Sequence, residues 1–93
     1  MNFGQAIAAA KAGGRIARAG WNGKGMWVGY TPASEFKPEF AKKGHASALR
    51  AEEAPDEMVK LLPHLDMRTA DGSMCIGWLA SQADMLATDW EVV

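Results

Sequence analysis

The chain has 93 residues, of which 48% are hydrophobic and 23% are charged, and its net charge at pH 7 is -1. This composition predicts a single globular domain over residues 1–93, because the chain is too apolar for disorder and lacks the ~20-residue apolar run of a membrane span. The near balance of acidic and basic residues disfavours a binder of nucleic acid polymers and favours a small ligand or a protein partner.

One short amphipathic helix is predicted over residues 3–12. Asn2 and Gln5 have the spacing of a capping box. Apolar residues recur at i, i+3, i+4 and i+7 on one face, namely at Phe3, Ala6, Ile7 and Ala10. The pair Gly13-Gly14 should end this helix.

A β-hairpin is predicted next. Residues Arg15–Ala19 alternate with the period of a strand, and Gly25–Tyr30 continue as the return strand. Asn22-Gly23 is the preferred pair for a tight two-residue turn. Trp21 should lie beside the tip of this hairpin.

The segment from residue 31 to about 60 changes character, because Ala, Lys, Glu and Pro dominate it. We expect residues 31–60 to form a solvated insert or lid within the domain. Ser47–Glu53 and Asp56–Leu62 are predicted to be single helical turns packed on the outside, and Lys42-Lys43-Gly44 interrupts any longer helix.

A second hairpin is predicted from Leu65–Ala70 and Ser73–Trp78, which flank the turn pair Asp71-Gly72. Ser81 and Asp84 form another capping box, which opens a short helix that runs through Ala87.

Residues 90–93 should form a final strand. Two hairpins and this C-terminal strand, with an N-terminal helix and a short C-terminal helix, predict an α+β fold around an antiparallel sheet.

The four tryptophans lie in two blocks at the ends of the chain, and all four prolines lie between those blocks. Aromatic faces next to Arg, Asn, Ser and Gln suit a planar, partly charged ligand such as a nucleotide. A single tryptophan is more often a core residue, but four in so small a domain favour at least two that line a pocket or an interface. We assign Trp21 and Trp78 to ligand stacking and Trp90 to the core.

Three polar positions have both a structural and a binding interpretation. Arg68, beside Thr69, is either a cross-strand partner of an acidic residue or a clamp on a phosphate. Ser81 and Gln82 either begin a helix or present unpaired amides to an anion.

Catalysis is disfavoured. The chain has one cysteine, Cys75, and two histidines, so it offers neither a disulfide nor a ligand set for zinc, and we expect no metal and no cofactor. Of the four aspartates that follow residue 65, two are explained as turn and cap residues, and none has an evident histidine partner. The first 14 residues lack the features of a signal peptide, so we expect a cytoplasmic protein.

Three strings of residues carry a specific likeness. They are the opening Met1-Asn-Phe-Gly-Gln-Ala, the string Gly20-Trp-Asn-Gly-Lys-Gly-Met, and the long stretch from Leu62-Pro-His-Leu-Asp-Met-Arg-Thr-Ala-Asp-Gly to Trp78-Leu-Ala-Ser-Gln-Ala-Asp-Met-Leu-Ala-Thr-Asp-Trp. Together they resemble the phage Thoeris anti-defence family of small sponge proteins, over residues 1–30 and 61–93.

The resemblance implies a phage protein that binds bacterial immune signals in the host cytoplasm and does not cleave them. In that family the ligand is glycocyclic ADP-ribose, some members also bind CBASS cyclic di- or trinucleotides, and members are homotetramers with sites between subunits. The segment 31–60 is longer than the connection expected in such a protein. The resemblance implies these ligand-binding residues: Trp21, Asn22, Trp27, Arg68, Thr69, Trp78, Ser81 and Gln82.

A different function class stays open. The tryptophans also suit the hot spots of a protein-interaction module, such as a phage inhibitor of a host protein. Hydrolysis of the same signal is disfavoured by the absence of histidine and metal chemistry.

Overall fold

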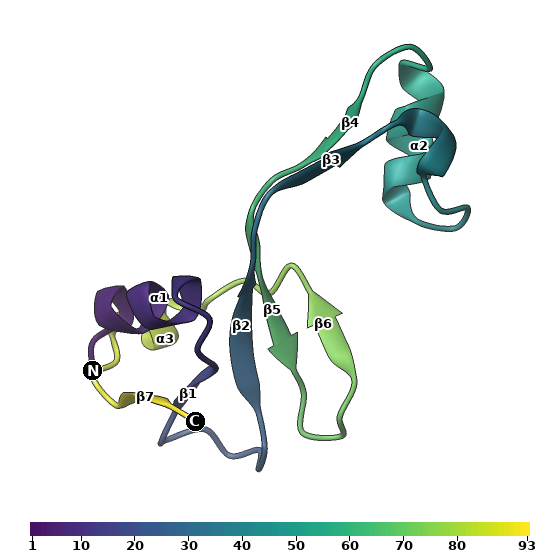
Figure 1. Cartoon of the computed structure of the whole chain (residues 1–93). Helices are drawn as coiled ribbons and strands as arrows, with labels where there is room; N and C mark the ends of the chain where they lie inside the picture. Colours follow the sequence, from purple (N-terminus) through teal and green to yellow (C-terminus); the bar gives the residue numbers. More distant parts are fainter. The chain divides into compact units, whose positions relative to one another are not determined.

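The computed structural model describes all residues, Met1–Val93, and places them in two compact units. The sheet unit comprises Met1–Thr31 and His64–Val93, and the insert unit comprises Pro32–Pro63. No helix has both the length and the apolar character needed to cross a membrane. In chain order the elements are α1 (Phe3–Lys11), β1 (Ile16–Arg18), β2 (Trp27–Thr31), β3 (Ser34–Phe36), the 3-10 helix η1 (Pro38–Phe40), α2 (Ala46–Glu53), β4 (Val59–Leu61), β5 (His64–Arg68), β6 (Met74–Ile76), α3 (Gln82–Leu86) and β7 (Trp90–Val92) (Figure 1).

The sheet unit contains a five-stranded sheet in the order β6-β5-β2-β1-β7, in which every neighbouring pair is antiparallel. The hairpins β1–β2 and β5–β6 join through β2 and β5, and β7 adds to the free edge of β1. Strands β2, β5 and β6 run side by side in Figure 1. The predicted α+β class, with two hairpins and a C-terminal strand, is confirmed.

The core lies on the face of the sheet that α1 covers. Side chains alternate along a strand, so one residue in two points to this face. Trp90 is 2% exposed, which confirms its assignment to the core, and its ring centroid lies 5.3 Å from that of Phe3. The buried core residues are Ala6, Ala10, Ile16, Val28, Met67 and Trp90.

Both predicted capping boxes are present. The side chain of Asn2 accepts a hydrogen bond from the Gln5 backbone N–H at 2.8 Å, and the Gln5 side-chain oxygen accepts one from the Asn2 backbone N–H at 2.9 Å. At α3, the Ser81 hydroxyl accepts from the Asp84 backbone N–H at 3.1 Å. These bonds satisfy backbone donors that a helix start leaves unpaired.

The connection between β1 and β2 is not the predicted tight turn. No residue other than glycine has a positive φ, so Asn22 is not in the conformation that a two-residue turn of this class needs. The eight residues 19–26 form a loop, in which Gly25 has a φ of 76°. Bonds to a distant residue hold the loop instead: the Ala19 N–H donates to the Asp89 carbonyl, and the Gly20 N–H donates to the Asp89 carboxylate.

The second hairpin is confirmed and has a three-residue loop. The Thr69 N–H donates to the Ser73 carbonyl at 2.8 Å, and Gly72 between them has a φ of 93°. Asp71 accepts bonds from the Ser73 hydroxyl, the Thr69 hydroxyl and the Ser73 backbone, which hold the pKa of its carboxyl well below the usual range. The side chains of Thr69, Asp71 and Ser73 are thus bonded to one another within the loop.

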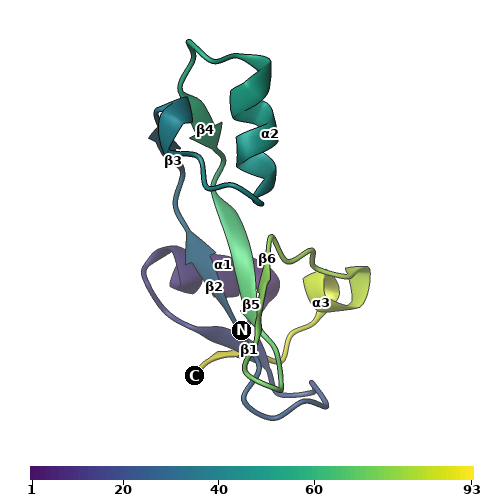
Figure 2. The ribbon, with the colours of Figure 1, turned by 90° about the vertical axis from the view of Figure 1, so that its right-hand side faces the viewer.

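The insert unit contains α2, η1 and a two-stranded antiparallel sheet of β3 and β4, as Figure 2 shows. The predicted helical turn at Ser47–Glu53 is confirmed within α2. The helical turn predicted at Asp56–Leu62 is wrong, because Val59–Leu61 pair with Ser34–Phe36 and Val59 is buried. Pairing with a segment distant in the sequence overrides the weak local preference.

Candidate functional site

A row of side chains crosses the sheet on the face opposite α1. Trp27 is the cross-strand partner of Arg68, and Arg68 is the partner of Met74. On the other side, Glu91 is the partner of Ala17. The Ile16–Val28 pair sets a register that brings Ala17 opposite Trp27. An aromatic ring therefore lies between a cationic end of the row, at β5, and an acidic end, at β7.

This row lines a cleft of about 610 Å³, which also receives side chains from the loop 19–26. The volume falls within the range of small-molecule sites. The basic side chains that line the cleft are Arg15, Arg18, Lys24 and Arg68, and Glu91 is its acidic residue.

Trp27 is the aromatic platform of the cleft. Gly29, two residues further along β2, has no side chain, and the Trp27 ring lies against that position. The guanidinium carbon of Arg15 lies over the ring, 5.7 Å from its centroid, in a cation–π contact. Trp27 is half-buried and lies outside the core cluster, so part of its ring is available to a ligand.

Arg68 lines another wall of the cleft. One guanidinium nitrogen, Nη1, donates to the Gly25 carbonyl at 3.0 Å and to the Thr69 carbonyl at 3.2 Å. Its cross-strand partners are Trp27 and Met74, so the structural interpretation of Arg68 as the cross-strand partner of an acidic residue does not hold. A guanidinium has five N–H donors, and those not used by these carbonyls suit a phosphate.

Arg18 holds the loop 19–26 beside the cleft, and its guanidinium is already bonded to two carboxylates. It donates through Nη1 to Asp84 and through Nε to Asp89, each at 2.9 Å. The pKa of the Asp89 carboxyl is lowered, first by the Arg18 bond and then by the Gly20 N–H. Burial raises the pKa of Asp84, but bonds from Arg18, Trp21 and Ser81 together lower it below its ordinary value.

Trp21 reaches the cleft but is also part of a tryptophan cluster. Its ring meets those of Trp78 and Trp90 edge-on, at centroid distances of 6.1 and 5.3 Å. Its indole N–H donates to Asp84 at 3.1 Å. Trp21 therefore anchors the loop to α3 while one side of it faces the cleft.

Three of the eight expected site residues line this cleft: Trp21, Trp27 and Arg68. The other five do not. Asn22 and Gln82 are exposed, Thr69 is bonded within the hairpin loop, Trp78 packs against the core, and Ser81 caps α3. The start of α3 also carries the Asp84 carboxylate, which accepts from the Ser81 N–H at 3.3 Å and opposes an anion there.

The structure adds Arg15, Lys24 and Glu91, which sequence reasoning missed. Alternation contained a signal for two of them, because Arg15 precedes the core residue Ile16 and Glu91 follows the core residue Trp90. Neighbours of core residues in a strand point to the opposite face.

A histidine–aspartate pair was also missed. His64 and Asp66 lie two residues apart on β5 and share a face, with His64 Nε2 3.5 Å from an Asp66 carboxylate oxygen. Asp66 is 7% exposed and accepts bonds from the Thr31 hydroxyl and the Gly77 N–H. Its two carboxylate oxygens therefore bind groups at the ends of β2 and β6. No group of three or more His, Cys, Asp or Glu is arranged to hold a metal ion.

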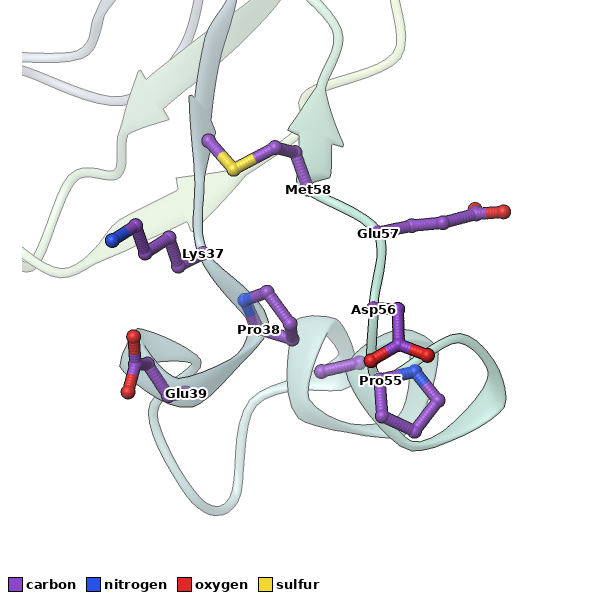
Figure 3. Close-up of a pocket in the computed structure, with 8 residues that line it drawn as sticks. Lys37, Pro38, Glu39, Pro55, Asp56, Glu57 and Met58 are labelled. Carbon is purple, nitrogen blue, oxygen red and sulfur yellow. The ribbon is translucent and has the colours of Figure 1, made fainter.

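The insert unit has a pocket of about 660 Å³, drawn in Figure 3. Its charged side chains are Lys37, Glu39, Asp56 and Glu57, and Glu57 is already paired with Arg50 at 3.1 Å. Three carboxylates against one ammonium disfavour an anionic ligand, so the cleft of the sheet unit is the better candidate for a nucleotide site.

Comparison with known proteins identifies the family. The Tad2-like family, described as the Thoeris anti-defense 2-like domain, matches residues 1–93. The chain belongs to this family. It is 30% identical to the protein named Thoeris anti-defense 2 from Bacillus phage SP01 over 93 residues, which are 100% of this chain and 94% of that protein.

The match corrects one expectation about the insert. The region 31–60 was expected to exceed the connection found in the family, but the family match extends from the first residue to the last and includes the insert unit. The aligned relative is covered almost completely, so the insert is no large addition to it.

Proposed function

We propose that this member of an anti-defence family acts by binding and sequestering a nucleotide signal of the bacterial immune response, without cleaving it, in the cytoplasm of the infected cell. The family supports the phage anti-defence role. The observation that supports nucleotide binding is the cleft of the sheet unit, where the Trp27 ring lies between basic side chains.

Each part of a nucleotide has a matching group in the cleft. Stacking of a base on an aromatic ring is worth about 1 to 3 kcal/mol. The free N–H groups of Arg68, and Lys24 of the same cleft, provide charge-assisted bonds for phosphate. The ligands proposed are glycocyclic ADP-ribose and, as a second class, the cyclic di- or trinucleotides of CBASS.

Effective sequestration requires nanomolar binding, about 12 kcal/mol. An open cleft on one protomer reaches that affinity only when water is excluded and the site is preorganised. We therefore propose a homotetramer in which a neighbouring subunit closes each cleft.

Exposed apolar side chains of the sheet unit support this assembly. Ile76 is 68% exposed, Leu79 is 89% exposed and Leu86 is 74% exposed, and burial of such side chains between subunits would remove apolar surface from water. Light scattering should give the mass of a tetramer at micromolar concentration. A stable monomer would contradict the assembly.

The experiment that tests sequestration is incubation of the protein with glycocyclic ADP-ribose and a panel of cyclic nucleotides, followed by filtration and release of the bound ligand by heat. Intact ligand in the released fraction is the expected result. Release of a chemically altered nucleotide would show that the protein is an enzyme.

No retention of any nucleotide would favour the second candidate function, a module that binds a host protein through the same exposed apolar residues.

A further inference from the structure

Glu91 is the acidic residue of an otherwise basic cleft. It lies in the middle of the edge strand β7, exposed, and takes part in none of the ion pairs of the chain. Its carboxylate is therefore not paired with a basic side chain.

The position of Glu91 relative to Trp27 and Arg68 is fixed by the strand register. Glu91 lies in the same cross-sheet row, two strands from Trp27 and three strands from Arg68. With strands about 4.8 Å apart, these separations are about 10 and 14 Å along the sheet. Ala17, the residue between Glu91 and Trp27, lines the same cleft and is itself buried, with 6% of its surface exposed.

This polarity orients a nucleotide. A phosphate prefers the Arg68 end and is repelled at the Glu91 end, so hydrogen-bond donors of a nucleotide that spans the cleft meet Glu91. An ionised carboxylate only accepts hydrogen bonds, so it favours hydroxyl or N–H donors. A carboxylate that binds ribose hydroxyls is also how dinucleotide sites reject a phosphorylated ribose.

We propose that Glu91 is a specificity-determining residue, which accepts hydrogen bonds from ribose hydroxyls of the bound nucleotide and excludes nucleotides that carry a phosphate monoester on that ribose. This inference rests on the proposed function of the same cleft. A monoester carries about -1.5 to -2 charges at pH 7, and a carboxylate at this end repels it. A protein that sequesters a scarce signal needs such rejection, because other phosphorylated nucleotides would otherwise fill the cleft.

The test uses two competitors that differ by one phosphate: ADP-ribose and ADP-ribose 2′-phosphate. Each is titrated against glycocyclic ADP-ribose bound to the wild-type protein and to the Glu91→Gln and Glu91→Lys variants. The wild type should prefer ADP-ribose by about tenfold or more, since a like charge is opposed. Glu91→Gln should reduce this preference by about tenfold, and Glu91→Lys should reverse it.

Matched variants at Glu52 separate a local effect from a change in net charge. Glu52 is exposed on α2 in the insert unit, so Glu52→Gln and Glu52→Lys should keep the wild-type preference. Equal competition by the two compounds in the wild type, or a preference unchanged in both Glu91 variants, overturns the inference and leaves the proposed function intact. Failure of the wild type to bind glycocyclic ADP-ribose overturns both.

Discussion

The indole ring of Trp27 lies against Gly29 of the same strand, so that a Cβ built on Gly29 would stand 3.4 Å from Cζ3 of Trp27. A glycine in the interior of a strand costs about 0.5 to 1 kcal/mol relative to alanine. At this position it leaves room for the ring to lie along the sheet and form the floor of the cleft.

Enlarging Gly29 should therefore lift the ring. Gly29→Ala places a methyl group at an ordinary contact distance and should bind glycocyclic ADP-ribose almost as the wild type does. Gly29→Ile should lose about 1 to 2 kcal/mol of binding, part of the stacking energy, while a β-branched residue preserves the strand. Calorimetric affinities and melting temperatures of both variants provide the test, and wild-type affinity in Gly29→Ile would refute this role of the glycine.

Arg68→Ala should weaken nucleotide binding by about 1.5 to 3 kcal/mol, because a charge-assisted bond to phosphate is lost. Arg68→Lys should restore the affinity only in part, since the planar fork is lost. Arg50→Ala, which removes an exposed arginine of the insert unit, is the matched control and should bind normally. Unchanged affinity in Arg68→Ala would mean that Arg68 serves only the Gly25 and Thr69 carbonyls.

Trp90 and Trp27 should separate stability from binding. Trp90 is fully enclosed, so Trp90→Ala should lower the free energy of unfolding by about 3 to 5 kcal/mol. Trp27→Ala should lower the affinity by about 1 to 3 kcal/mol with a much smaller loss of stability. Denaturant unfolding and ligand titration on both variants check this, and a Trp27→Ala protein that unfolds would place its ring in the core.

Acid should destabilise the protein by weakening the ion pairs that Arg18 forms with Asp84 and Asp89. The folded-state pKa values of Asp84 and Asp89 are lowered, so their contribution to stability is present above the unfolded pKa of about 3.9. It is lost as the pH falls through the lower folded-state values. Melting temperatures should fall below about pH 4 in the wild type and less steeply in Arg18→Met, which lacks the guanidinium. Arg50→Met controls for lost charge, and parallel curves for the wild type and Arg18→Met would contradict this account.

The starts of α1 and α3 were predicted correctly because they depend on local chemistry. Asn2 with Gln5 and Ser81 with Asp84 set the starts of α1 and α3 through bonds within one turn, which a sequence displays directly. Strand β4 was missed, because Val59 is held by pairing with Phe36, far away in the sequence.

The site divides in the same way. Trp27 and Arg68 carry visible chemistry, and the structure brings them together as cross-strand partners. Trp21 was assigned to stacking alone, but its bond to Asp84 joins residues 63 apart, and no local pattern encodes that contact. The register across four strands, which brings Glu91 into the row, is likewise a tertiary property.

The most direct test of the central claim is the structure of the protein bound to glycocyclic ADP-ribose. The account predicts that the nucleotide occupies the cleft of the sheet unit, with a base on the Trp27 ring and a phosphate on the Arg68 guanidinium. A nucleotide seated in the insert unit pocket, or at the start of α3 against Ser81, would contradict it.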